Sequence, residues 1–463
     1  MKITFVGAGS RIFCKNILTD ILAFPALRKN TTIALHDINE QRLEHVYQEM
    51  ELYKADHADK LANVEFTRTT DMREAIDGAR YVIDAVMVGG PEPLKLDIDI
   101  PMKYGVDQCI GDTTSAGAVF RALRTFPVLA EIISTMREVG YNAGQKNCAR
   151  PLLLNYANPM AMNTWYCNAL WPGSTVGLCH GVQGTFKQLY ATYIGASAEE
   201  CSFLCAGINH MAWFTELWFK DATIKDAKWQ DAYPIIREHY KDEPEIVNDE
   251  KVRWDMMKAT GYYMTESSGH LSEYVPYYRK RRDLIEKYKG NTNGFNNLQH
   301  GWDLQFFGAN TDAVEAEARM KPRSMKFKDT PSEEYASHII NAMETNQPFR
   351  FNGNVMNIKG GLITNLPADC CVEMPIFADY HGLHPQGGIE LPTVCVALCT
   401  SSIMVHKATI EGALTHDKEK IYQAVLLDPL SAAVCSPEEI RQMVDEMFEA
   451  EKQWLGWFKN ELK

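Results

Sequence analysis

The sequence predicts an α/β protein whose N-terminal part is a Rossmann-like, doubly wound parallel sheet and whose C-terminal part is an α+β domain. Short apolar runs alternate with amphipathic stretches over the first ~190 residues, as in strands that alternate with helices. A glycine-rich turn follows the first apolar run directly. From about residue 196 the pattern changes to longer helical stretches, and we therefore predict two domains, 1–195 and 196–463.

Five apolar runs are the predicted strands of the parallel sheet: Lys2–Val6, Thr31–Asp37, Tyr81–Val86, Leu152–Tyr156 and Thr175–Cys179. Glycine or polar residues follow at the end of each run. In such a sheet the carboxyl ends of the strands lie at one edge, where ligands bind. We therefore expect one crevice to gather Gly7, Asp37, Gly89, Gly90, Asn155 to Asn158, Cys179 and His180.

The first turn, Gly7-Ala8-Gly9-Ser10, predicts a dinucleotide site. Gly7 permits a tight turn, and Gly9 lets the backbone approach a pyrophosphate held by the following helix. Asp37 closes the second strand, where a carboxylate accepts hydrogen bonds from a ribose diol and disfavours a 2′-phosphate, so NAD+ is favoured over NADP+. The third glycine of the usual motif is replaced by Ile12. The predicted cofactor-binding residues are Gly7, Ala8, Gly9, Ser10, Asp37, Gly89, Gly90 and Asn155.

The C-terminal part mixes helical stretches with strand-like runs at Gly207–Leu217 and Cys371–Phe377. Residues 224–300 are rich in Trp, Tyr and charge, which is typical of a lid or helical subdomain facing a substrate. Residues 437–459 form a predicted amphipathic helix capped by Ser436. We expect the two domains to be arranged as in lactate and malate dehydrogenases.

Composition excludes several classes of protein. The 463 residues carry 47 Lys and Arg against 60 Asp and Glu, a net charge of −13, which lacks the basic footprint of proteins that bind nucleic acid or anionic membranes. No apolar run approaches the ~18–20 residues of a membrane helix. The chain enters its glycine motif without a preceding signal peptide, so we expect a cytoplasmic protein. Its 12 cysteines include no CxxC pair, and we expect reduced thiols, mostly in the core.

Cys179 and His210 are candidate metal ligands. Cys179 ends a strand at the predicted crevice, and His210 lies 210 − 179 = 31 residues further along, in a Gly-Ile-Asn-His-Met stretch. A thiolate and an imidazole together can form an open metal site that substrate oxygens and water complete. Taken singly, the two residues are better explained as a buried structural cysteine and a hydrogen-bonded core histidine.

Longer motifs extend over the whole chain. They are GAGS at Gly7–Ser10, Asp37-Ile38, RALRT at Arg121–Thr125, NPMAMNTW at Asn158–Trp165, GLCHGVQGT at Gly177–Thr185, AGINHMA at Ala206–Ala212, TESSGHLSEY at Thr265–Tyr274, NLPADCCVE at Asn365–Glu373 and Asp428-Pro429. In these motifs the chain resembles glycoside hydrolase family 4, the NAD- and metal-dependent glycosidases, and especially the alpha-galactosidase branch.

The resemblance implies roles for particular residues. Cys179 and His210 match the metal ligands, with Mn2+ as the usual metal, although a thiolate alone would suggest Zn2+ or Fe2+. His180 matches a proton donor to the leaving oxygen. Asn158 matches an asparagine that holds substrate hydroxyls, and Asp112 matches an acidic group lining the sugar site. The candidates for the base that removes the C2 proton are Glu266, His270 and Tyr274.

The resemblance also implies a mechanism that joins a redox cofactor to hydrolysis. NAD+ oxidises C3 of the sugar, the metal polarises the ketone, a base removes the C2 proton, the glycosidic bond breaks by elimination, water adds, and NADH reduces C3 again. The enzyme therefore departs from the usual pair of catalytic carboxylates. We expect a small-molecule glycoside as the substrate, no nucleic acid or membrane partner, and a homo-oligomer, either a dimer or a tetramer.

Two departures from the alpha-galactosidase pattern bear on the substrate. The stretch Ser115–Ala118 replaces a Gly-Pro-Gly-Gly turn, and Gly181 replaces a serine. No basic pair for a sugar phosphate is evident, because we interpret the run Arg279–Arg282 as a solvated helix face. Non-phosphorylated alpha-galactosides are therefore the leading substrates, with glucuronides, galacturonides or glucosides as alternatives. A plain NAD-dependent hydroxy-acid dehydrogenase and a non-enzymatic NAD sensor are the rival functions.

Overall fold

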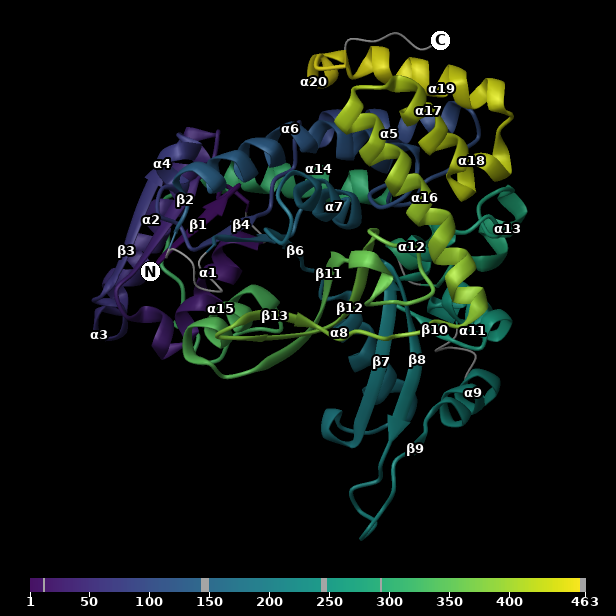
Figure 1. Ribbon diagram of the computed structural model, residues 1–463, viewed down its shortest axis with the longest axis horizontal. Coiled ribbons are helices and arrows are strands. Elements are labelled where there is room, and N and C mark those ends of the chain that lie inside the picture. The colour runs from purple at the N-terminus through teal and green to yellow at the C-terminus, as the bar shows by residue number, and fades with distance from the viewer. Residues whose placement is uncertain (11–12, 143–149, 243–247, 292–293, 459–463) are drawn as a thin grey trace.

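The computed structural model describes residues 1–10, 13–142, 150–242, 248–291 and 294–458. Ile12, at the position of the missing third glycine, lies outside these residues. One continuous sheet runs through the described part of the chain in the order β10-β8-β7-β12-β11-β6-β5-β4-β1-β2-β3, with β13 paired to β12 and β9 to β8. The sheet passes from the N-terminal strands at one side of Figure 1 to the β7–β8 hairpin at the other.

The N-terminal half of the sheet is parallel and has the strand order 3-2-1-4-5-6 of a dinucleotide-binding fold. Its strands are β1 Lys2–Val6, β2 Thr31–His36, β3 Val64–Thr69, β4 Tyr81–Asp84, β5 Leu152–Asn155 and β6 Thr175–Gly177. The five predicted strands are confirmed, each ending at or within two residues of the predicted end. The edge strand β3 was not predicted.

Alternate residues of these strands face opposite cores, as the two-residue period of a strand requires. Ile3 and Phe5 pack in one core with helices α1 (Phe13–Ala23), α2 (Glu40–Asp56) and α15 (Tyr335–Thr345). Val6 packs in the other core with α6 (Ala116–Val139) and α7 (Met160–Leu170). Helices therefore cover both faces of the parallel sheet, as expected of a doubly wound fold, and the predicted fold class is confirmed.

The C-terminal half of the sheet is antiparallel. Its strands are β7 Cys201–Ile208, β8 Met211–Phe219, β9 Gln230–Asp231, β10 Tyr263–Met264, β11 Phe349–Met356, β12 Cys371–Asp379 and β13 Gly382–Pro385. Asn354 of β11 pairs with Gly177 of β6 and so joins the two halves into one sheet. The predicted domain boundary at residue 195 stays a prediction.

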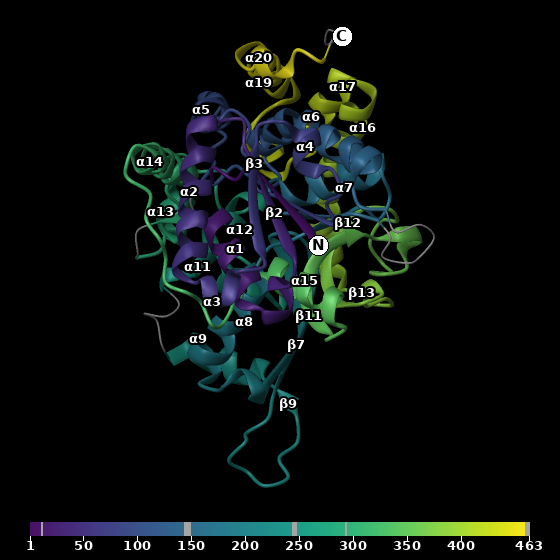
Figure 2. The same cartoon turned by 90° about the vertical axis from the view of Figure 1, so that its left-hand side faces the viewer.

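The single predicted strand Gly207–Leu217 is wrong in its extent. The chain turns at Asn209 and His210, between β7 and β8, and His210 has a φ of +62°. The connection from β8 to β9 projects from the body at the bottom of Figures 1 and 2.

The last helices gather with α5 (Pro91–Lys103) and α6 toward the opposite end of the molecule, the top of Figures 1 and 2, and α16 extends from there down to the middle of the molecule in Figure 1. They are α16 Thr393–Thr415, α17 Lys418–Leu427, α18 Pro429–Val434, α19 Pro437–Ala450 and α20 Lys452–Leu455. Ser436 caps α19 in a capping box with Glu439, as predicted. This helix ends at Ala450, nine residues before its predicted end at Lys459, which lies outside the described residues.

One of the described helices, α16, is long and apolar enough to cross a membrane by length and composition alone. The expectation that no apolar run approaches that length is therefore corrected for this segment. The helix packs against α6, α7, α17 and β7, and its buried side chains include Cys399, Ile403 and His406. Those contacts are the contacts of a core helix.

The remaining helices connect the sheet strands. They are α3 Ala58–Leu61, α4 Met72–Ile76, α8 Gly181–Gln188, α9 Tyr233–Asp242, α11 Lys251–Thr260, α12 Ser268–Tyr274, α13 Arg282–Tyr288 and α14 Trp302–Ala318. Four of them, α9, α11, α12 and α13, lie in the segment that was expected to form a lid or helical subdomain. Every cysteine that the structure describes is a free thiol, and all of them except Cys179 and Cys435 are buried.

Candidate functional site

The glycine turn after β1 lies directly against the end of β2. The backbone N–H groups of Gly7 and Ala8 both donate to the carbonyl oxygen of His36, each at 2.9 Å. Gly7 has a φ of +84°, which favours glycine. The N–H of Gly9 donates to Asp37 Oδ2 at 2.8 Å, and a Cβ at Gly9 would lie only 2.8 Å from that oxygen. The predicted turn and the predicted ribose carboxylate therefore form one unit.

Three other predicted cofactor-binding residues, Gly89, Gly90 and Asn155, follow or end neighbouring strands. Gly89 and Gly90 follow β4 with φ values of +81° and +65°, and Gly90 precedes Pro91, the first residue of α5. Asn155 ends β5 and is fully buried. Its side chain accepts from the N–H of Ala157 and donates to the carbonyl oxygen of the same residue. Asn155 thus shapes the loop that carries Asn158.

Cys179, His210 and Glu266 bring three different donor atoms together. Cys179 Sγ lies 3.5 Å from His210 Nε2 and 3.6 Å from Glu266 Oε1, and these last two atoms lie 3.8 Å apart. Cys179 follows β6, His210 occupies the turn between β7 and β8, and Glu266 precedes α12. His210 and Glu266 both have positive φ values, +62° and +68°, a strained backbone that is common at functional sites.

The electrostatics of this cluster favour a cation. Burial, and then the nearby charge of Glu266, raise the pKa of the Cys179 thiol well above its ordinary value. A thiolate beside a carboxylate is therefore unfavourable unless a positive charge lies between them, and a divalent cation supplies that charge and deprotonates a coordinating thiol. Sulfur, imidazole nitrogen and carboxylate oxygen are all metal ligands. The residues present therefore fit a divalent metal.

Asp112 and Asn158 lie next to this cluster. Asn158 Nδ2 donates to Asp112 Oδ2 at 2.8 Å, and Thr113 Oγ1 donates to the other oxygen, Oδ1, at 2.7 Å. Asp112 is buried. Burial alone would raise the pKa of Asp112, but His210, His270 and Arg121 together lower it. The carboxylate is thus ionised and can accept hydrogen bonds from a sugar.

His180 lies at the exposed side of the site. Its side chain is 59% exposed, and its Nδ1 lies 3.1 Å from Glu334 Oε1. The hydrogen bond to Glu334 raises the pKa of His180. A protonated imidazole next to a candidate metal ligand is suited to donate a proton to a leaving group.

The three candidates for the C2 base all lie around His210. Glu266 Oε1 lies 3.8 Å from His210 Nε2. The His270 ring packs edge-on against the His210 ring at 4.9 Å, and burial lowers the pKa of His270. The hydroxyl of Tyr274 lies 3.5 Å from His210 Nδ1, and burial with the Asp112 charge raises the pKa of Tyr274. The structure therefore brings all three candidates into one site.

Several residues of the site were not predicted. Thr113 bridges Asp112 and His210, and its place beside Asp112 in the sequence was the only signal for it. Glu334 directly precedes α15, far away in the chain. Glu273 accepts the backbone N–H groups of residues 109, 110 and 111 and so holds the loop before Asp112. Burial raises the pKa of Glu273 to about 7.

The interpretation of Arg279–Arg282 as a solvated helix face is wrong in part. Arg279 is buried and donates to Asp107 and to the carbonyl oxygen of Leu298. It precedes α13, which begins only at Arg282. The buried carboxylate and carbonyl compensate its charge, so Arg279 is a structural cation, while residues 280–282 are exposed.

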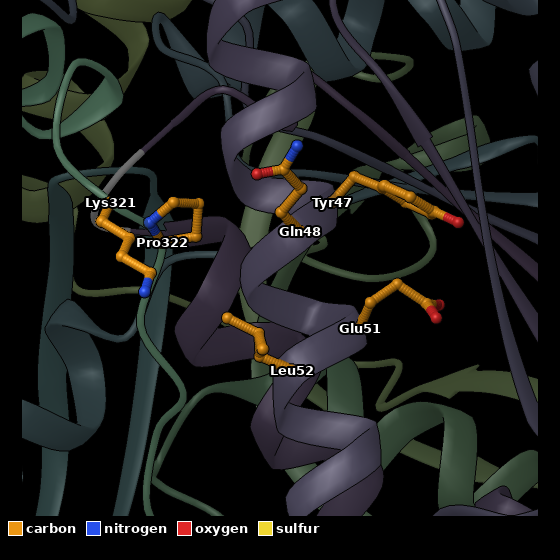
Figure 3. Close-up of a pocket in the computed structure, with 6 residues that line it drawn as sticks. All are labelled: Tyr47, Gln48, Glu51, Leu52, Lys321 and Pro322. Carbon is orange, nitrogen blue, oxygen red and sulfur yellow. The ribbon is translucent and has the colours of Figure 1, made fainter.

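A separate hollow lies on the outer side of α2 (Figure 3). It is lined by Tyr47, Gln48, Glu51, Leu52, Lys321 and Pro322. None of the predicted site residues lines it.

Comparisons with known proteins agree with this geometry. Residues 2–193 match the model of "Family 4 glycosyl hydrolase", and residues 205–431 match that of the "Family 4 glycosyl hydrolase C-terminal domain". The chain is 40% identical to an alpha-galactosidase of Rhizobium meliloti (strain 1021), covering 98% of this chain and 89% of that protein. It is 39% identical to an alpha-galactosidase of Bacillus subtilis (strain 168), covering 99% and 100%.

A solved structure has the same fold. The 6-phospho-beta glucosidase from Thermotoga maritima, determined with manganese, NAD+ and glucose-6-phosphate, superposes with a TM-score of 0.75 at 20% identity. The match covers 98% of this chain and 99% of that one. Together with the two family models, which span most of the sequence, these matches show that the chain belongs to glycosyl hydrolase family 4.

Proposed function

We propose that this chain is an NAD+- and divalent-metal-dependent glycosidase that hydrolyses alpha-galactosides. The observation that carries the proposal is the position of the Cys179, His210 and Glu266 donors. They lie at the carboxyl-terminal side of the same sheet whose first strand ends in the glycine turn. A dinucleotide held by the turn would therefore direct its reactive end toward the metal donors.

The glycine turn after β1 and Asp37 after β2 are suited to binding NAD+. The turn at Gly7 and Gly9 leaves no room for side chains, and Asp37 uses each carboxylate oxygen for one backbone N–H, from Gly9 and from Asn39. A carboxylate accepts about four hydrogen bonds, so capacity remains for a ribose diol. The cofactor supplies a hydride acceptor and then a hydride donor for C3 of the sugar.

The donor set around His210 fits a divalent cation, which by family resemblance is Mn2+. The cation supplies charge stabilisation that acidifies the proton at C2. Around it, Asp112 and Asn158 are placed to hold sugar hydroxyls, and His180 is placed to protonate the leaving oxygen. The C2 base is one of Glu266, His270 and Tyr274.

The charge around Asp112 favours a neutral sugar. Arg121, whose charge acts on Asp112, is paired with Asp303 at 3.5 Å, and both side chains are buried. An anionic substrate such as a galacturonide needs a cation that is free to bind its carboxylate. This pairing argues against galacturonides and glucuronides, and the alpha-galactosidase relatives at about 40% identity support alpha-galactosides ahead of glucosides.

A panel of nitrophenyl glycosides, assayed with NAD+, Mn2+ and a thiol reductant, tests the proposal. We expect release of nitrophenol from the alpha-galactoside, dependence on both cofactors, and no net change in absorbance at the NADH wavelength. Stoichiometric accumulation of NADH with no sugar release would instead indicate a plain dehydrogenase. Full activity after rigorous removal of NAD+ would contradict the proposal.

We also propose that the protein works in the cytoplasm as a homo-oligomer. A thiol metal ligand and the free cysteines are suited to a reducing compartment. Phe377 and Tyr380, at the β12–β13 hairpin, expose 43% and 51% of their surface, and a second subunit would cover such aromatic side chains. Light scattering coupled to gel filtration tests the oligomer: the mass of a monomer would contradict it.

A further inference from the structure

We infer that Glu266 is a third protein ligand of the metal, and that this chain accommodates it because residue 181 has no side chain. The inference rests on the proposed metal dependence, and it goes further by assigning Glu266 to the cation instead of to C2 of the sugar.

The position of the Glu266 carboxylate is the first observation. Its Oε1 faces both Cys179 Sγ and His210 Nε2, at 3.6 and 3.8 Å, and the three atoms lie within 4.8 Å of one another. Separations of this size are those of ligands around one ion, because metal–ligand distances are about 2.0–2.3 Å. A base that reached past the metal toward the sugar would not need to lie within 4 Å of both other ligands.

Gly181 is the second observation. It is the first residue of α8, and a Cβ built on it would lie 1.6 Å from Glu266 Oε1 and 2.8 Å from Glu266 Cδ. The φ of Gly181 is not in the left-handed region, so the backbone does not require glycine there. What requires glycine is the space that the carboxylate occupies.

The two glycines of α8, Gly181 and Gly184, have different surroundings. Gly184, in the same helix, provides the contrast, because a Cβ there would meet no atom within 4 Å. One glycine of α8 is therefore coupled to Glu266 and the other is not.

A carboxylate ligand changes the character of the site. Cysteine and histidine alone favour Zn2+ or Fe2+, whereas carboxylate oxygens suit Mn2+. With three protein ligands, the remaining positions are open to water and to sugar oxygens. Glu266 is then removed from the candidates for the C2 base, which leaves His270 and Tyr274.

The test measures Mn2+ binding to the full chain without NAD+ or sugar, by electron paramagnetic resonance of free Mn2+ and by calorimetry. We expect Glu266→Gln and Gly181→Ala each to weaken Mn2+ binding about 10- to 100-fold, at least the loss that follows when a partner of a metal ligand is removed. Gly181→Ala displaces only the end of a flexible side chain, and so the protein should fold. Gly184→Ala, the matched control, should bind Mn2+ as the wild type does.

The double variant Gly181→Ala/Glu266→Gln sharpens the test. If both changes act through one carboxylate, the double variant should bind Mn2+ no more weakly than the weaker-binding single variant. Fully additive losses would contradict the coupling. Zn2+ binding should fall less than Mn2+ binding in Glu266→Gln, because the thiolate and imidazole remain.

Cys179→Ser separates failure of this inference from failure of the proposed function. If Cys179→Ser loses Mn2+ while Glu266→Gln and Gly181→Ala bind it like the wild type, Glu266 is not a ligand and the proposed function stands. If Cys179→Ser also binds Mn2+ like the wild type, the metal site itself is wrong. NAD+ binding in every variant reports that the N-terminal half has folded.

Discussion

Thr113 fixes the orientation of His210. Thr113 Oγ1 donates its one proton to Asp112 Oδ1 at 2.7 Å and lies 2.8 Å from His210 Nδ1, so it can only accept from that nitrogen. His210 therefore carries its proton on Nδ1 and presents the lone pair of Nε2 toward Cys179 and Glu266. A hydrogen bond that sets the tautomer of a ligating histidine in this way is usual at metal centres.

Thr113→Val should weaken Mn2+ binding about 10- to 100-fold, because it keeps the shape of the side chain but removes the acceptor for His210. Thr113→Ser keeps the hydroxyl and should restore most of the affinity. Calorimetric titration with Mn2+ measures both variants. Equal binding by Thr113→Val and the wild type would show that Thr113 does not orient the histidine.

Asp37→Ala should weaken NAD+ binding by about 1–3 kcal/mol, because a charge-assisted hydrogen bond to the ribose is lost. The same change should narrow the preference for NAD+ over NADP+, since the carboxylate that repels a 2′-phosphate is gone. Fluorescence titration with the two reduced cofactors measures both effects. Unchanged affinity for both would remove Asp37 from the cofactor site.

His180→Ala should lose activity in proportion to how poor the leaving group is. In the proposed role the His180 imidazole donates a proton to the leaving oxygen, and its hydrogen bond to Glu334, which raises the pKa of His180, favours the protonated form. The loss should reach about 10²–10⁴-fold on natural alpha-galactosides and be much smaller on activated aryl glycosides, which leave without a proton. Measuring kcat/KM across an aryl series reveals the dependence. A uniform loss across the series would contradict this role.

The stability of the protein should fall in mild acid because of His406 in α16. Burial lowers the pKa of His406 to about 4, from an ordinary value of 6.5. The unfolded chain therefore binds a proton between pH 6.5 and pH 4 that the folded chain excludes, and stability decreases as the pH falls through that window. The contribution is about 2 kcal/mol between pH 7 and pH 5.

His406→Met removes this titration and replaces the imidazole with a flexible apolar side chain that can fill the same space. In this variant, the free energy of unfolding in urea should therefore differ between pH 7 and pH 5 by about 2 kcal/mol less than in the wild type. An unchanged difference would show that other groups account for the acid sensitivity.

The parallel half of the fold could be predicted because its central strands are buried on both faces and form continuous apolar runs. The edge strand β3, Val64–Thr69, was missed because its apolar residues alternate with exposed polar ones. The β7–β8 turn was missed because Asn209-His210 lacks the glycine that usually marks a hairpin.

In the site, sequence could place Cys179 and His180 in a crevice, since they end a predicted strand. It could not show that Glu266 lies against Cys179, because 87 residues separate them in the chain. Their contact also depends on the absence of a side chain at Gly181, where a Cβ would overlap the Glu266 carboxylate. Nor could it distinguish buried Arg279 from its exposed neighbours, since that depends on Asp107 lying opposite. Such pairings are fixed by tertiary packing and leave no local pattern.

Hydrolysis in heavy water tests the central claim most directly. If the glycosidic bond breaks by elimination, the C2 proton must leave before the bond breaks, and a solvent deuteron must return when the double bond is hydrated. We expect galactose with deuterium at C2, measured by NMR and mass spectrometry of the released sugar, with NAD+ and Mn2+ both required. Galactose that carries no deuterium at C2 after complete turnover would contradict the account.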